Sequence, residues 1–236
     1  MANNNRTLSL SSGIIYTIVH SNRRTVAIEV KPSGEVIVRA PAHMPYATAR
    51  AFAESKAEWI EKALEKVETQ RREREATMPP PFTGADGDVL LFLGKTLTAK
   101  RIAGASSPHI EGGFLILPAE IELPGIINWL REQAADEINA RLLKYGELLG
   151  VTWKSVRLSD ARTRWGMCSG KNSINLSWRL IFCIPEAIDY VVAHELCHIK
   201  HKNHKAEFYD ELERVFPERR RVEHWLKEHS MLINYL

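Results

Sequence analysis

Residues 185–204 read PEAIDYVVAHELCHIKHKNH, and this stretch sets the organisation of the last third of the chain. Pro185 has no backbone N–H and suits the first turn of a helix. The apolar residues Ile188, Val191 and Val192 follow it, so we expect a buried helix that runs to about Lys200. A buried helix holds the polar side chains that it carries in fixed positions.

Two histidines lie four residues apart on this helix. Positions i and i+4 of an α-helix are about 40° apart around the axis and about 6 Å apart along it, so His194 and His198 can bind one ion from the same face. Neutral imidazole is a good zinc ligand near neutral pH, with Zn–N bonds of roughly 2.0–2.1 Å. The spacing therefore predicts Zn²⁺ as the cofactor.

Glu195 lies beside the face of the two histidines and can reach a metal-bound water without ligating the metal. Such a carboxylate takes a proton as the water attacks a peptide carbonyl, and then delivers it to the leaving amine. The H-E-x-x-H pattern also arises by chance, but on an apolar helix an unpaired buried glutamate would be costly. We therefore expect a zinc metallopeptidase, a hydrolase of peptides or proteins, with Glu195 as general base.

A catalytic zinc site needs a third protein ligand and one open position. His201 shares the metal face but lies about 10 Å along the axis from His194. His204 is better placed if the helix ends near residues 201–203 and the chain turns back, with Asn203 in the left-handed conformation that asparagine tolerates. We favour His204, with His201 or a distant acidic residue as alternatives.

Several motifs around the helix form a recognisable set. They are RTRWGMCS (162–169), INLSWRL (174–180), Pro185, IDYVV (188–192), the histidine run and Phe208. With these motifs, residues 157–225 resemble the YgjP-like metallopeptidases, a group related to the WLM and SprT-type zinc peptidases. The resemblance implies a zincin-like domain in which His194, His198 and His204 bind zinc and Glu195 is the base. The ligand spacing also matches the metzincins, which have a glycine where this chain has His201.

Substrate contacts are expected just before the helix. Zinc peptidases of this kind commonly hold the substrate as a strand added to a sheet edge, and residues 173–178, with Ile174 and Leu176, are our candidate for that edge. Arg164 is a candidate to stabilise the negative charge that develops on the oxygen of the scissile carbonyl, and Tyr209 is a weaker candidate for this role. The competing interpretations are that residues 173–178 form an internal strand and that Arg164 forms a structural ion pair.

The rest of the chain predicts an α+β protein. Branched residues and turn signals indicate strands at 14–20, 25–30 and 35–40, before a long helix from Pro45 to about Glu75 that stops at residues 78–81. A hairpin at 89–102, a strand at 114–117 and a helix from Pro124 to Leu149 follow. We divide the chain into strands plus a long helix (1–80), a strand-rich connecting segment (81–124) and a zincin-like catalytic domain (125–236).

The composition limits the class of protein and the compartment that we expect. Hydrophobic residues make up 44% and charged residues 26%, as in ordinary folded proteins. No apolar run approaches the roughly 20 residues of a membrane span, no signal peptide is visible, and three cysteines suit a reducing compartment, so we expect a cytoplasmic protein without a membrane partner.

The net charge of +3 permits contact with nucleic acid but does not predict it. The alternative functions are a non-catalytic zinc-binding module, acting as a scaffold or with nucleic acid, and a SprT- or WLM-like protease of DNA-bound proteins.

Overall fold

The computed structural model describes residues 6–77 and 80–236, apart from the side chains of residues 74–77. The chain forms two compact units, residues 1–76 and 77–236. Both combine helices with sheets, which confirms the predicted α+β class. Met78 and Pro79, where the sequence predicts that the long helix stops, lie outside the described residues.

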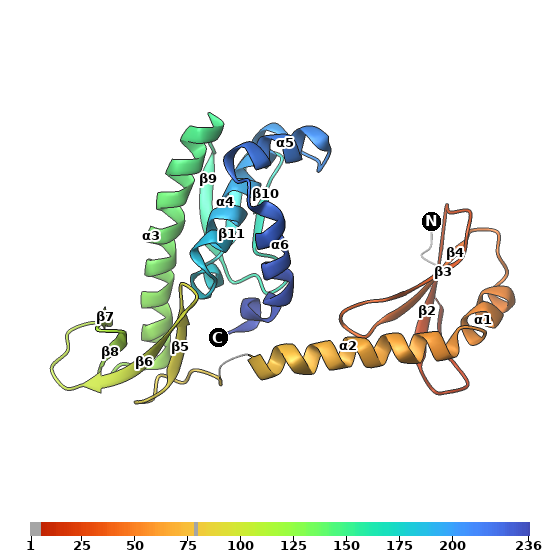
Figure 1. The fold of residues 1–236 in the computed structure, drawn as a ribbon, viewed down its shortest axis with the longest axis horizontal. Helices are drawn as coiled ribbons and strands as arrows, with labels where there is room; N and C mark the ends of the chain where they lie inside the picture. Colours follow the sequence, from red (N-terminus) through yellow and green to blue (C-terminus); the bar gives the residue numbers. More distant parts are fainter. Residues whose placement is uncertain (1–5, 78–79) are drawn as a thin grey trace. The chain divides into compact units, whose positions relative to one another are not determined.

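The first unit is a four-stranded sheet with two helices (Figure 1). Its elements are β1 (Arg6–Ser9), β2 (Ile15–Ser21), β3 (Ala27–Val30), β4 (Val36–Pro41), α1 (Tyr46–Glu54) and α2 (Ala57–Thr77). The strand order is β1-β2-β4-β3; β2 and β4 are parallel, and the other pairs are antiparallel. Ile18 and Val38 from the sheet and Ile60 from α2 are fully buried and form the centre of its core.

The predicted helix from Pro45 is two helices in the structure. The first ends at Glu54 and the second begins at Ala57. At the break, the Ser55 hydroxyl donates a 2.8 Å hydrogen bond to the carbonyl oxygen of Phe52. Such local side chain–backbone bonds compete with helix propagation, which accounts for the interruption.

The second unit contains two sheets and most of the helices. Its elements are β5 (Val89–Phe92), β6 (Lys95–Ile102), β7 (His109–Glu111), β8 (Phe114–Pro118), α3 (Leu123–Leu149), β9 (Ser155–Ser159), β10 (Gly166–Cys168), β11 (Ser173–Ser177), the 3₁₀ turn η1 (Trp178–Phe182), α4 (Pro185–Lys200), α5 (Ala206–Val215), α6 (Arg219–Glu228) and η2 (Ser230–Asn234). The strand orders are β5-β6-β8-β7 and β10-β11-β9. As predicted, α3 ends at Leu149; the next residue, Gly150, is left-handed with φ 63° and ψ 41°.

The tip of the β5–β6 hairpin supports the start of α4. Leu93 and Gly94 both have positive φ, and the Leu93 N–H donates a 2.7 Å hydrogen bond to the Ile181 carbonyl. A Cβ at Gly94 would lie 2.5 Å from Cγ2 of Ile184, the residue before α4, so only glycine allows this approach. The hairpin therefore packs against the backbone that leads into α4.

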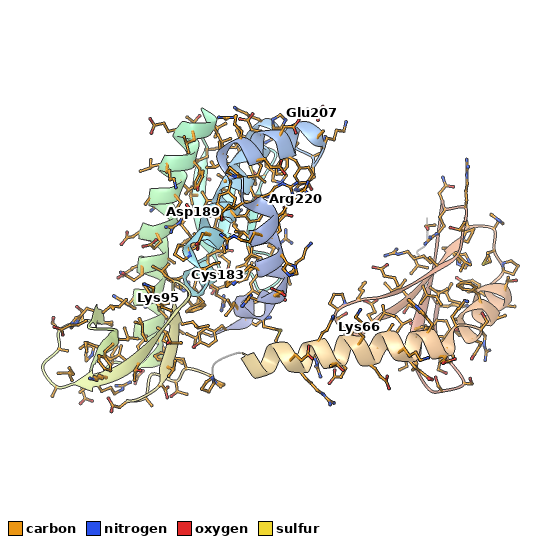
Figure 2. All side chains as sticks on the ribbon, in the orientation of Figure 1. Lys66, Lys95, Cys183, Asp189, Glu207 and Arg220 are labelled. Carbon is orange, nitrogen blue, oxygen red and sulfur yellow. The ribbon has the colours of Figure 1, made fainter. Side chains whose placement is uncertain are left out.

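Helix α4 lies between α3 on one side and α6 on the other (Figure 1). Its residues Ile188, Val192 and Leu196 are fully buried. Asp189, labelled in Figure 2, forms ion pairs with Arg141 and Lys144 of α3 at 3.6 and 3.7 Å. Buried contacts on both sides thus hold α4 in place, as its apolar sequence predicts.

Two further predictions concern the whole chain. The strands of residues 89–118 belong to the same compact unit as residues 125–236, and the division into three parts stays a prediction. Among the helices of the described residues, none has an apolar stretch long enough to cross a membrane.

Candidate metal centre

Helix α4 and the turn after it bring three histidines together. The Nε2 atoms of His194 and His204 are 3.1 Å apart, and one ring nitrogen from each of His194, His198 and His204 lies within 4.8 Å of the others. Nitrogens bound to one zinc ion at roughly 2.0–2.1 Å and tetrahedral angles would be about 3.4 Å apart. The three rings therefore form a cluster of the size that one ion requires.

The turn that delivers His204 differs from the predicted one. Helix α4 ends at Lys200, and His201 adopts an extended conformation with φ −118° and ψ 103°. Asn203 does not have a positive φ, so the predicted left-handed turn at this residue is wrong. Because the extended backbone at His201 leaves the helix path at once, the chain returns without a left-handed residue.

The imidazole of His201, an alternative third ligand, does not belong to the cluster; the backbone of this residue contributes instead. Its carbonyl oxygen lies 2.9 Å from Nδ1 of His198. A carbonyl only accepts, so Nδ1 of His198 carries the proton and Nε2 keeps its lone pair. Such a bond fixes both the tautomer and the orientation of a metal-binding histidine.

A second chain of hydrogen bonds orients His194. The Tyr190 hydroxyl donates to Oε1 of Glu223 at 2.9 Å, and its oxygen lies 3.3 Å from Nδ1 of His194. Since the hydroxyl proton goes to Glu223, Nδ1 of His194 donates to Tyr190 and its Nε2 is left unprotonated. Arg219 in turn binds Glu223 at 3.2 Å. Both α4 histidines thus present a free Nε2 to the cluster.

Burial keeps the histidines of α4 neutral. It lowers the pKa of His194 to about 3, with smaller contributions from His198 and His204. Burial also lowers the pKa of His198, against an opposing effect of the hydrogen bond to His201. Below the three rings, Phe208 of α5 is fully buried, with its centroid 4.7 to 4.9 Å from each imidazole centroid. Neutral imidazole is the form that binds metals.

Glu195 lies under the edge of the β10-β11-β9 sheet. Its side chain is only 6% exposed. Burial raises its pKa from the ordinary 4.5 to about 7, while a hydrogen bond from the backbone N–H of Cys168 opposes this rise. A carboxyl group with a pKa near 7 can both take up and release a proton at neutral pH.

Gly166 allows β10 to approach Glu195. A Cβ at this position would be 2.6 Å from Oε1, 2.7 Å from Cγ and 2.9 Å from Cδ of Glu195. Residues 166–168 are not among the strands expected from the sequence, so neither β10 nor this contact was predicted. A glycine inside a strand often marks such a close backbone approach, and that signal was available.

The profile of the YgjP-like metallopeptidase domain matches residues 24–229, most of the chain. The chain belongs to the YgjP-like metallopeptidase family. This bears out the resemblance found at residues 157–225, and it establishes a peptidase family that uses a metal ion. No curated protein matches the YgjP-like chain.

Two solved structures are similar to part of this YgjP-like protein. The metallopeptidase zymogen abylysin of Pyrococcus abyssi is 26% identical, with a TM-score of 0.36, over 39% of this chain and 93% of that chain. The metallopeptidase zymogen jannalysin of Methanocaldococcus jannaschii is 20% identical, with a TM-score of 0.36, over 39% of this chain and 88% of that chain.

The predicted substrate strand of the YgjP-like protein requires a correction. β11 is the central strand, with β10 antiparallel on one side and β9 parallel on the other, so it has no free edge. Ile174 and Leu176 are fully buried in the core and cannot contact a substrate. The prediction of an edge at residues 173–178 is therefore wrong, and the strand itself ends at Ser177, before η1. The two edge strands of this sheet, among the residues that the structure describes, are β10 and β9, and β10 is the one beside Glu195.

The other two candidate contacts lie on different sides of the site. Arg164 precedes β10 and is exposed, with Nη1 3.5 Å from Sδ of Met167. The Tyr209 ring lies 6.1 Å from that of His204, and the Arg219 guanidinium covers it at 4.5 Å. The substrate contacts of Arg164 and Tyr209 stay predictions.

The three consecutive arginines at the start of α6, Arg219, Arg220 and Arg221, bear on nucleic-acid contact, and all have acidic neighbours. Arg219 pairs with Glu213 at 2.8 Å, and Arg221 pairs with Glu218. Arg220, labelled in Figure 2, is highly exposed and lies 4.0 Å from Glu213. This pattern is typical of a solvated helix surface rather than of a concentrated basic patch.

Proposed function

We propose that this YgjP-like protein is a zinc-dependent metallopeptidase in which His194, His198 and His204 hold the ion. The observation that carries the proposal is the cluster of three ring nitrogens within 4.8 Å, beside a buried glutamate. Three imidazoles suit Zn²⁺, whereas Mg²⁺ and Ca²⁺ prefer oxygen ligands. Three protein ligands also leave a fourth position open, as a catalytic site needs.

The residues around the cluster support hydrolysis. A bound Zn²⁺ would acidify a coordinated water and polarise the substrate carbonyl. Glu195 then accepts a proton from the attacking water and delivers it to the nitrogen of the leaving amine. The Cys168 N–H holds the carboxylate at the edge of β10 during both steps.

Strand β10 can hold the peptide. The Ser177 N–H donates to the Trp165 carbonyl at 2.8 Å, and the Ser169 N–H donates to the Ser173 carbonyl at 2.9 Å. The backbone N–H and C=O groups of successive residues point to opposite sides of a strand. Those of Trp165, Met167 and Ser169 therefore face β11.

The backbone groups of Gly166 and Cys168 face away from β11. The Cys168 N–H contacts Glu195, which leaves the N–H and C=O of Gly166 and the C=O of Cys168 for a substrate strand. Main-chain hydrogen bonds of this kind bind peptides of varied sequence. They would place the peptide backbone beside Glu195.

The decisive experiment compares the zinc-loaded wild type with Glu195→Gln on a diverse peptide library. We expect the variant to lose hydrolysis by about 10²- to 10⁴-fold, the usual contribution of a general base, and to keep one zinc ion per chain. Glu207→Gln is a matched control because Glu207 is an exposed residue of α5. If the wild type cleaves nothing, or if Glu195→Gln cleaves equally well, a non-catalytic zinc-binding module becomes the better description.

A further inference from the structure

The free edge of β10 determines where substrate side chains point. In an added antiparallel strand, successive side chains alternate between the two faces of the sheet, and directly opposite residues share a face. Gly166 and Cys168 lie on the face toward Glu195, so Met167 lies on the other face. The substrate residue opposite Met167 therefore points to the face away from Glu195, with its Cβ about 4.5–5.5 Å from that of Met167.

That face of the sheet contains a groove. It has a volume of about 390 Å³, more than one side chain needs, and is open to solvent. Among its lining residues are Ser159, Thr163, Arg164, Trp165, Met167 and Asn175. No aspartate or glutamate lines it, so the charge that its side chains present is positive.

Arg164 supplies this charge beside Met167. Its Nη1 atom is 3.5 Å from Sδ of Met167, and 38% of Met167 is exposed. In the part of the chain that the structure describes, no carboxylate pairs with Arg164, although many of the other arginines have such partners. A guanidinium matches a carboxylate in both charge and planar geometry.

We propose that this groove selects substrates with an aspartate or glutamate opposite Met167, and that Arg164 binds its carboxylate. The inference rests on the proposed function, because it places a peptide along β10. Cys168 is the neighbour of Met167 and contacts Glu195, so the acidic residue lies within about two residues of the bond that is cut. Arg164 is then a specificity residue, not the group that steadies the scissile carbonyl.

The test uses the zinc-loaded full chain and a peptide library in which each position near the cut site is varied. We expect the wild type to prefer Asp or Glu over Gln at one fixed position by about fivefold, the upper range for an exposed ion pair. Arg164→Glu should abolish this preference or reverse it toward Lys, and Arg164→Lys should keep most of it. Arg157→Glu is the matched control, since Arg157 is exposed on β9 of the same sheet and does not line the groove.

A binding measurement separates this inference from the proposed function. Zinc-loaded Glu195→Gln, with and without Arg164→Glu, is titrated with fluorescent peptides that differ only by Glu or Gln at the selected position. For this arm the peptides come from the cleaved sequences or, if none is cleaved, from a scan of Glu through a neutral peptide. Equal binding of acidic and neutral peptides, or a preference that survives Arg164→Glu, overturns the inference even if hydrolysis is confirmed. An Arg164-dependent preference supports the groove even if no peptide is cleaved, in which case only the proposed hydrolysis fails.

Discussion

Replacing Gly166 with alanine is expected to displace the Glu195 carboxylate from its working position. The new Cβ would lie 2.7 Å from Cγ and 2.6 Å from Oε1 of Glu195. An ordinary carbon–carbon contact is about 3.5 Å, so Cγ must retreat by about 0.8 Å or β10 must move outward by a similar amount. A shift of this size in a catalytic group lowers kcat/KM by on the order of 10²-fold, which is about 2.7 kcal/mol of transition-state stabilisation.

The same crowding should lower the free energy of unfolding by about 1–3 kcal/mol, the usual cost of overpacking. Zinc affinity should not change, because the atoms nearest to this Cβ belong to Glu195 and not to a histidine. The measurements are kcat/KM on a cleaved peptide, zinc stoichiometry and chemical denaturation.

Gly170→Ala is the control for this experiment. It lies four residues further on, where an added Cβ meets nothing within 4 Å and φ is not positive. If kcat/KM of Gly166→Ala lies within about threefold of Gly170→Ala, the contact with Gly166 does not position Glu195 and the reasoning is refuted.

Three other variants test the surroundings of the cluster. Tyr190→Phe should raise the Kd for zinc by about tenfold in a chelator competition, because His194 loses the partner of its Nδ1; an unchanged Kd would contradict this. His201→Ala should leave zinc affinity unaltered, since a main-chain carbonyl orients His198, and a loss of about tenfold or more would show that the imidazole ligates. In metal-free protein, a pKa raised from 4.5 to about 7 means that folded Glu195 holds a proton that the unfolded chain has released, so the contribution of this group to stability falls by up to ~3 kcal/mol as pH rises through this window, against the opposite contribution of His194, whose pKa is lowered. The free energy of unfolding of Glu195→Gln relative to wild type should therefore rise between pH 4.5 and 7 in denaturation curves, and a difference that does not change with pH would contradict this.

Much of helix α4 could be predicted from the sequence, because its determinants are local. Pro185, the apolar residues behind it and the i, i+4 spacing of His194 and His198 each act within one or two helical turns. The two-residue interruption at Ser55 was not foreseen, although its hydrogen bond is also local, because serine occurs in intact helices too.

The sheet edge proposed to hold the substrate could not be predicted from the sequence. Residues 173–177 have the branched, alternating pattern of a strand, and they do form β11. The pattern does not say which neighbours a strand has, and β11 has one on each side. The three-residue β10 is too short to show any period, yet its pairing leaves it at the edge, beside Glu195.

The sequence alone determined the helix, its two histidines and the glutamate between them, since spacing along one helix sets how those side chains project. Only the tertiary structure decided that His204 rather than His201 completes the cluster, that Glu223 orients His194 through Tyr190, and that β10 is the edge strand beside Glu195. The physical reason is that these features depend on how separate elements pack. Glu223 lies 33 residues from Tyr190 along the chain, and no local pattern relates them.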